Sequence, residues 1–171
     1  MAISSSEIKL IYSGALASNT NANDSYGGQI STDAGGIITS DQLNNDMDDI
    51  TSAEAASGIT IYHAYYYKNT NSTLTYIAPK IYIESNTGTN ETESYIGVPP
   101  ELKNVSVQRL TTELTPAPTS VTFSAPANYA AGLALLDLPS TNYRGIWVKY
   151  VVDASASAVL DEYTLGIQGD S

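Results

Sequence analysis

GITIYHAYYYKN, residues 58–69, is the stretch that decides the fold of this chain. It is rich in β-branched and aromatic residues and is followed by turn-forming residues at 69–72, so it predicts one long strand. Successive side chains of a strand point to opposite faces, so Ile59, Ile61, His63, Tyr65 and Tyr67 share one face, and Thr60, Tyr62, Ala64, Tyr66 and Lys68 share the other. Both faces carry large apolar side chains. We therefore expect a central strand, with the core on one side and the N-terminal segment or a partner chain on the other.

Shorter alternating stretches along the rest of the chain predict further strands. They lie at 8–12, 77–84, 95–98, 105–108, 121–124, 133–138, 143–152 and 163–167. Pro79 suggests that the strand carrying it is an edge strand or begins there. Eight or nine strands without a βαβ rhythm predict an all-β fold, either an antiparallel β-sandwich or a jelly-roll-like barrel.

Residues 1–57 precede the β-sandwich body predicted at 58–171, and the two form a single folded unit overall. The polar, Gly-rich run 13–39 is long for a loop inside a domain, which predicts either an extended arm across a neighbour or a loop folded back on its own domain. Two capping boxes, Thr39 to Gln42 and Thr51 to Glu54, predict one or two short helices, near 40–49 and 52–57, with Gly58 ending the second. In the first, Leu43, Met47 and Ile50 form an apolar stripe, and Asp46, Asp48 and Asp49 are expected to face solvent.

The charge balance limits the possible partners. Lys and Arg number 7 against 18 Asp and Glu, which gives a formal net charge of −11. DNA-binding surfaces neutralise phosphates with Lys and Arg, so we expect no nucleic-acid partner. Anionic membranes are disfavoured in the same way, and no run approaches the ~18 apolar residues of a membrane span, so we expect no membrane partner. The absence of Cys excludes disulfides and thiolate zinc sites and is compatible with folding in a reducing cytoplasm.

Motifs typical of catalysis and of cofactor binding are missing, so we expect neither an enzyme nor a cofactor. The one histidine, His63, lies within the long strand between tyrosines, where a packed structural role is the ordinary one. The acidic residues Asp46, Asp48, Asp49 and Glu54 offer oxygen ligands for Ca²⁺, but without the alternating ligands and central Gly of a calcium loop. We expect them to be a solvated helix face rather than a metal site.

Several short motifs occur in order along most of the chain: YSGA at 12–15, SN at 18–19, GG at 27–28, AEAASG at 53–58, KNT at 68–70, VTFSAP at 121–126, YRGIWVK at 143–149 and LGIQGD at 165–170. Together they resemble those of a group of tailed-bacteriophage virion proteins. The resemblance implies a structural component of the particle. Where relatives tend to carry an Arg after the Tyr of the long strand, this chain has His63 after Tyr62, so no role of that Arg is carried over.

Size and charge then favour a capsid decoration, or cement, protein on the outer capsid surface, made in the host cytoplasm. Its expected partners are the major capsid protein and other copies of itself, as a homo-oligomer. Tyr is common at interfaces, and thirteen Tyr stand against one Trp and one Phe. The residues expected at the interface are Ile8, Leu10, Tyr12, Tyr26, Tyr62, Tyr66 and Trp147. The alternative is a tail- or fibre-associated module that binds host-surface carbohydrate through exposed tyrosines.

Overall fold

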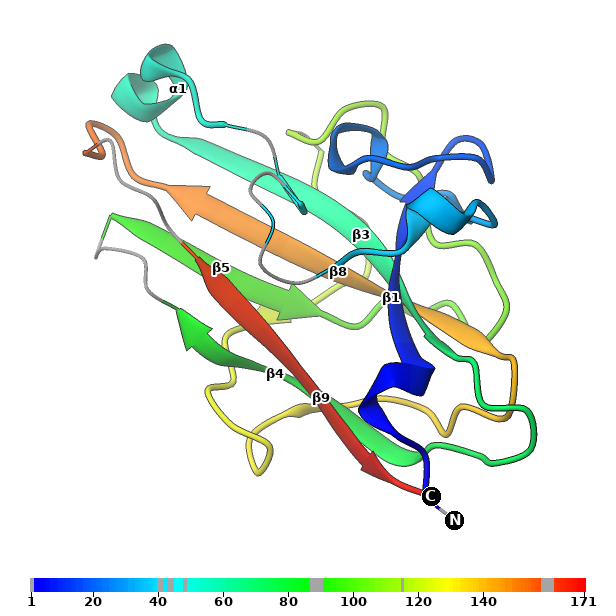
Figure 1. Ribbon diagram of the computed structural model, residues 1–171. Coiled ribbons are helices and arrows are strands. Elements are labelled where there is room, and N and C mark those ends of the chain that lie inside the picture. The colour runs from blue at the N-terminus through cyan, green and yellow to red at the C-terminus, as the bar shows by residue number, and fades with distance from the viewer. Residues whose placement is uncertain are drawn as a thin grey trace.

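The computed structural model describes residues 2–39, 42, 45–47, 49–86, 91–114, 116–157 and 162–171. Within these ranges the chain forms nine strands in two antiparallel sheets, one short α-helix and three 3-10 turns (Figure 1). The predicted all-β sandwich is confirmed, and the sheets are not closed into a barrel. No helix in the described ranges is long and apolar enough to cross a membrane.

The larger sheet has six strands and the smaller has three. The order in the first is β2 (Gln29–Ile30), β1 (Ile8–Gly14), β3 (Ile59–Asn69), β8 (Tyr143–Val152), β5 (Thr92–Gly97) and β6 (Phe123–Ser124). The order in the second is β7 (Leu133–Ala134), β4 (Ile77–Asn86) and β9 (Tyr163–Asp170). The helical elements are α1 (Ser52–Ser57) and the 3-10 turns η1 (Ser5–Glu7), η2 (Ala22–Asp24) and η3 (Ala34–Gly36).

Strand β3 is central, as the sequence predicts. It pairs with β8 from Ile59↔Val152 to Lys68↔Tyr143, and with β1 over its second half, from Tyr65 to Asn69. Beyond the end of β1, loop carbonyls take over this edge: the amide of Ala64 donates to Ser25 (2.7 Å) and that of Tyr62 to Glu113 (2.7 Å). The long strand thus has a hydrogen-bonding neighbour along both edges, which a buried backbone requires.

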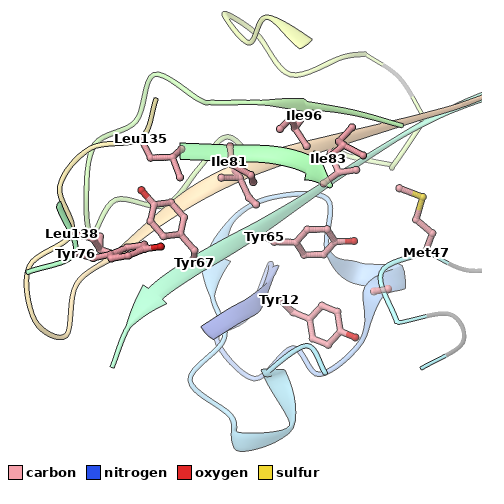
Figure 2. Packing of buried hydrophobic residues seen from close by; sticks show 13 residues of the cluster. Tyr12, Met47, Tyr65, Tyr67, Tyr76, Ile81, Ile83, Ile96, Leu135 and Leu138 are labelled. Atoms are coloured by element: carbon pink, nitrogen blue, oxygen red, sulfur yellow. The ribbon is translucent and has the colours of Figure 1, made fainter. Parts of the chain in front are cut away.

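One face of β3 builds the core between the two sheets. Tyr65 and Tyr67 are fully buried there, against Ile81 and Ile83 of β4 (Figure 2). Ile96, Leu138, Ile146 and Val148 belong to the same cluster. Alternation along strands of both sheets supplies these residues, as expected for a sandwich.

The opposite face of β3 and β8 is covered by the chain's own loops, and we call it the closed face. Ala64, Tyr66 and Trp147 are fully buried there. Their cover comes from two segments, 22–30 and 107–123, which supply Tyr26, Ile30, Val107, Leu110, Val121 and Phe123. Of the two arrangements expected for residues 13–39, the described residues therefore adopt the one folded back on the domain.

Tyr66 joins the two covering segments to the sheet. Its hydroxyl donates to the carbonyl of Gly28 and accepts from the amide of Val107 (2.8 Å). The backbone of Gly27 approaches the second segment so closely that a Cβ there would lie 1.9 Å from the carbonyl oxygen of Gln108, and its φ is +95°. Only glycine fits this position without strain.

Three sequence expectations differ from the structure. Pro79 does not mark an edge, because β4 is the central strand of its sheet. Pro79 lies in a register shift between Ile77 and Lys80, where the regular pairing with β9 is interrupted and its missing N–H is tolerated. The stretch 105–108 is no strand but a single bridge, Gly28↔Val107. Of the helix expected near 40–49, residues 40, 41, 43, 44 and 48 lie outside the described residues, and the described ones form no helix.

The second expected helix is confirmed as α1. Thr51 accepts from the amide of Glu54, and the Glu54 carboxylate accepts from the amide of Thr51 (2.8 Å), which completes the predicted capping box. Gly58 follows with φ 76°, a conformation that suits glycine and ends the helix. The chain then enters β3.

Candidate functional site

A cleft of about 1870 Å³ lies along one side of the sandwich, and we call it the open cleft. Strand β9 lines one wall, and residues 3–10 line the other. Tyr65, Tyr150 and Val152 of the larger sheet lie between these walls, and residues from the 38–56 segment line one end. Small-molecule pockets are typically about 300–1,000 Å³, so the open cleft has room for part of another macromolecule.

The open cleft is an exposed flank of the core between the sheets. Eight apolar or aromatic residues pack against that core, line the cleft and are only half-buried: Ile3, Ile8, Leu10, Ile38, Tyr150, Tyr163, Leu165 and Ile167. Contiguous apolar surface of this kind is typical of interaction sites. The core is thus left incompletely covered on this side.

Tyrosine hydroxyls hold residues 45–46 at the end of the open cleft. Tyr163 donates to the Asp46 carboxylate, Tyr65 donates to the Asp46 carbonyl, and Tyr12 donates to the Asn45 carbonyl. The rings of Tyr12 and Tyr65 meet edge to face, with centroids 6.2 Å apart, and both point toward the segment that carries Met47 (Figure 2). The tyrosines of β1, β3 and β9 thus fix one short segment in place.

His63 lies behind this cluster, fully buried in β3. Its Nε2 is 3.0 Å from a carboxylate oxygen of Glu113, and its Nδ1 is 3.0 Å from the hydroxyl of Tyr65 and also contacts the Asp46 carbonyl. Both ring nitrogens are therefore engaged by neighbouring oxygens. The ring connects the segments around Asp46 and Glu113 through the strand between them.

Burial sets the ionisation of this cluster. Loss of solvation raises the pKa of Asp46, although the Tyr163 hydrogen bond and the nearby His63 act in the opposite direction. Burial, followed by the Asp46 charge, raises the pKa of Tyr65 and of Tyr163 well above the ordinary tyrosine value. Both hydroxyls keep their protons at neutral pH and remain hydrogen-bond donors.

The structure changes the expectation for the acidic residues near α1. Asp46 does not face solvent: it is half-buried, and its carboxylate accepts the Tyr163 hydroxyl. The Glu54 carboxylate is occupied by the helix cap, which lowers its pKa through hydrogen bonds from the Thr51 side chain and backbone. Asp48 lies outside the described residues. Among the residues that the structure describes, no three His, Cys, Asp or Glu side chains group as metal ligands.

Two of the seven expected interface residues line the open cleft. Ile8 and Leu10 are half-buried on its β1 wall. Tyr12, the next residue on the same face of β1, is buried, and its hydroxyl donates to Asn45.

The other four lie on the closed face. Tyr26 and Tyr62 are half-buried there, with the Arg109 guanidinium 4.6 Å from the Tyr26 ring centroid. Tyr66 and Trp147 are fully buried, so neither ring offers surface to another molecule. Alternation shows that these rings share a face of the sheet, but not that a distant loop covers that face.

Sequence reasoning found the strand 163–167 without assigning it to a site. The alternation of Tyr163, Leu165 and Ile167 indicated a strand. No local sequence pattern showed that these residues line the same cleft as Ile8 and Leu10. Nothing in the local sequence indicated that the Asp46 carboxylate binds a tyrosine, because its partner Tyr163 is 117 positions away. The resulting site is a large, partly apolar cleft with a tyrosine–aspartate cluster at one end. In comparisons with known proteins, the chain matched no protein-family model, no curated protein and no solved structure.

Proposed function

We propose that this chain is a structural protein of a tailed-phage virion that decorates the outside of the capsid and strengthens the lattice by contacts between subunits. One observation carries this proposal: the apolar residues that flank the core are only half-buried along the open cleft, which suits contact with another protein. The cleft takes the place of the N-terminal run as the main contact element, because residues 22–30 of that run cover the chain's own closed face.

The charge supports an exterior position. A net charge of −11 is repelled by packaged DNA and keeps unbound copies apart in solution. On the capsid, each copy binds the major capsid protein and neighbouring copies.

The mechanism is stabilisation by binding. A protein that binds the assembled lattice but not its separated subunits stabilises the lattice by mass action. Repeated contacts from many copies add through multivalency. Neither step requires a catalytic group, a cofactor or a metal.

The test uses purified virions and empty capsids. We expect the chain to be present in proportion to the major capsid protein, on the outer surface in a cryo-electron-microscopy map, and the recombinant chain to cosediment with assembled capsids but not with unassembled capsid protein. A few copies confined to the tail would instead indicate the tail- or fibre-associated module, and retention on a glycan array would support that outcome. Absence of the chain from purified particles would refute both.

A further inference from the structure

We propose that the free edge of β9 binds an extended segment of a basic partner protein, which adds to the smaller sheet as a fourth strand and fills the open cleft. The source of that segment rests on the proposed function, since a virion supplies the partner. The chemistry of the segment does not, because the edge and the cleft define it by themselves.

The backbone of β9 is oriented for strand addition. Ile83 pairs with Leu165, but the Ile83 amide donates to the carbonyl of Pro126 (2.8 Å) and not to β9. Residues opposite each other in antiparallel strands either exchange both hydrogen bonds or point both backbone groups away. The N–H and C=O of Leu165 therefore point away from β4, toward the edge where no strand of the described chain pairs.

This edge has only part of the usual protection against pairing: two register shifts interrupt the β4–β9 ladder, and the Tyr76 hydroxyl donates to the Ile167 carbonyl (3.1 Å), a bond that the added strand would have to replace. Natural edge strands carry Lys or Pro, are very short, or are covered. Strand β9 spans eight residues, YTLGIQGD, without Lys or Pro. The β4–β9 pairing has register shifts between Ile77 and Lys80 and between Ile83 and Ser85, and Tyr163, Leu165 and Ile167 line the open cleft.

The open cleft fixes the pattern of the added strand. Every second side chain of a strand paired with β9 would point into the cleft. There it would meet Leu165 and Ile167 on one side and Ile8 and Leu10 on the other, all half-buried. Alternating apolar residues would bury this surface, while the residues between them would face solvent.

Charge decides what kind of chain supplies the strand. The described charged residues lining the open cleft are Asp46, Asp49 and Glu162 against Lys9, and Asp170 ends β9. A second copy pairing through its own β9, YTLGIQGD, would bring a further acidic residue and no Lys or Arg to balance these charges. The fitting occupant is therefore a different chain, with Lys or Arg flanking its alternating apolar residues.

The test uses the full chain and two synthetic nine-residue peptides, Lys-Val-Thr-Val-Thr-Val-Thr-Val-Lys and Glu-Val-Thr-Val-Thr-Val-Thr-Val-Glu, each acetylated and amidated and long enough to reach from Glu162 to Asp170. We expect the Lys peptide to bind about tenfold more tightly than the Glu peptide, because it pairs opposite charges at the strand ends. We also expect it to slow hydrogen exchange at the Leu165 amide. Asp170→Lys should reduce the difference between the peptides, whereas Asp24→Lys, an equal charge change in η2, should leave it intact.

Equal affinity for the two peptides would overturn the proposed partner chemistry, and an unprotected Leu165 amide would overturn strand addition. The proposed function fails separately. If the Lys peptide protects Leu165 but the chain is absent from virions, only the capsid assignment is wrong. If Asp170→Lys and the unmodified chain decorate capsids equally, only the β9 inference is wrong.

Discussion

The closed face lies on one side of the strand pair β3 and β8, and the core with its open cleft lies on the other, yet the two sides are covered to different extents. On the closed face, loops bury Ala64, Tyr66 and Trp147 completely. They also supply backbone partners, through Ser25 and Glu113, to the half of β3 that β1 does not reach. At the open cleft, apolar residues of β1 and β9 remain half-buried, and the β9 edge has no neighbouring strand in the described chain.

The difference shows that this chain seals one side of its main sheet with its own residues and leaves a flank of the other core uncovered. Residues of the closed face should therefore contribute more to stability than residues of the open cleft, which should tolerate change. Four tests examine this contrast, from the largest expected effect to the smallest.

Trp147→Ala should cause the largest loss of stability. The ring is fully buried on the closed face, and removing such a ring typically lowers the free energy of unfolding by about 3–5 kcal/mol. Denaturant unfolding measures the loss. Leu16→Ala is the control, because Leu16 is 68% exposed, and it should change stability by less than about 0.5 kcal/mol. A similar change in the free energy of unfolding for the two variants would mean that the closed face is not a packed core.

Tyr66→Phe and Tyr67→Phe form a matched pair at neighbouring positions. Loss of the Tyr66 hydroxyl leaves the Val107 amide and the Gly28 carbonyl without their partner, which should cost about 1–3 kcal/mol of unfolding free energy. The Tyr67 hydroxyl is buried without a hydrogen-bond partner, so its removal should be neutral or stabilising. A larger loss for Tyr67→Phe would contradict the structure.

Ile8→Ala tests the open cleft. Truncation of a fully buried Ile to Ala typically lowers the free energy of unfolding by about 2–5 kcal/mol. Ile8 is half-buried, so the loss here should be about 1 kcal/mol. The same unfolding measurement applies, with Ile8→Val as the conservative control. A loss equal to that of Trp147→Ala would show that this wall is as tightly packed as the closed face.

Asp46→Asn should have the smallest effect and depend on pH. The folded state holds the Asp46 proton more tightly than the unfolded state, since burial raises its pKa, so its contribution to stability falls as pH rises from the ordinary carboxyl value of about 4 through the raised value. Asn cannot ionise and keeps an oxygen acceptor for Tyr163. The unfolding free energy of Asp46→Asn relative to the unmodified chain should therefore increase with pH across that window. A difference that stays constant or falls would contradict the proposed burial of Asp46.

Local patterns were enough to predict most of the elements. β3 and β8 follow from alternation, and α1 follows from its capping box and Gly58, because each signal lies within a few residues of the structure it specifies. The stretch 105–108 also alternates, but its Val107 amide binds the hydroxyl of Tyr66, a partner that no local pattern reveals.

The open cleft could be predicted only in part. Ile8 and Leu10 were expected at an interface and do line the cleft, whereas Tyr66 and Trp147 were expected there and are buried. Composition indicates that a ring suits an interface, but only the tertiary fold decides whether a loop covers it. The wall formed by Leu165 required knowledge of how β9 and β1 face each other across two sheets.

The hydroxyl of Tyr66 has a dynamic consequence. It holds residues 28 and 107 against the sheet at one point, although they are 79 positions apart along the chain. Neither covering segment can lift away without releasing this shared anchor. The two segments should therefore open in a single subglobal unfolding event, with amide exchange at both proceeding at matched free energies.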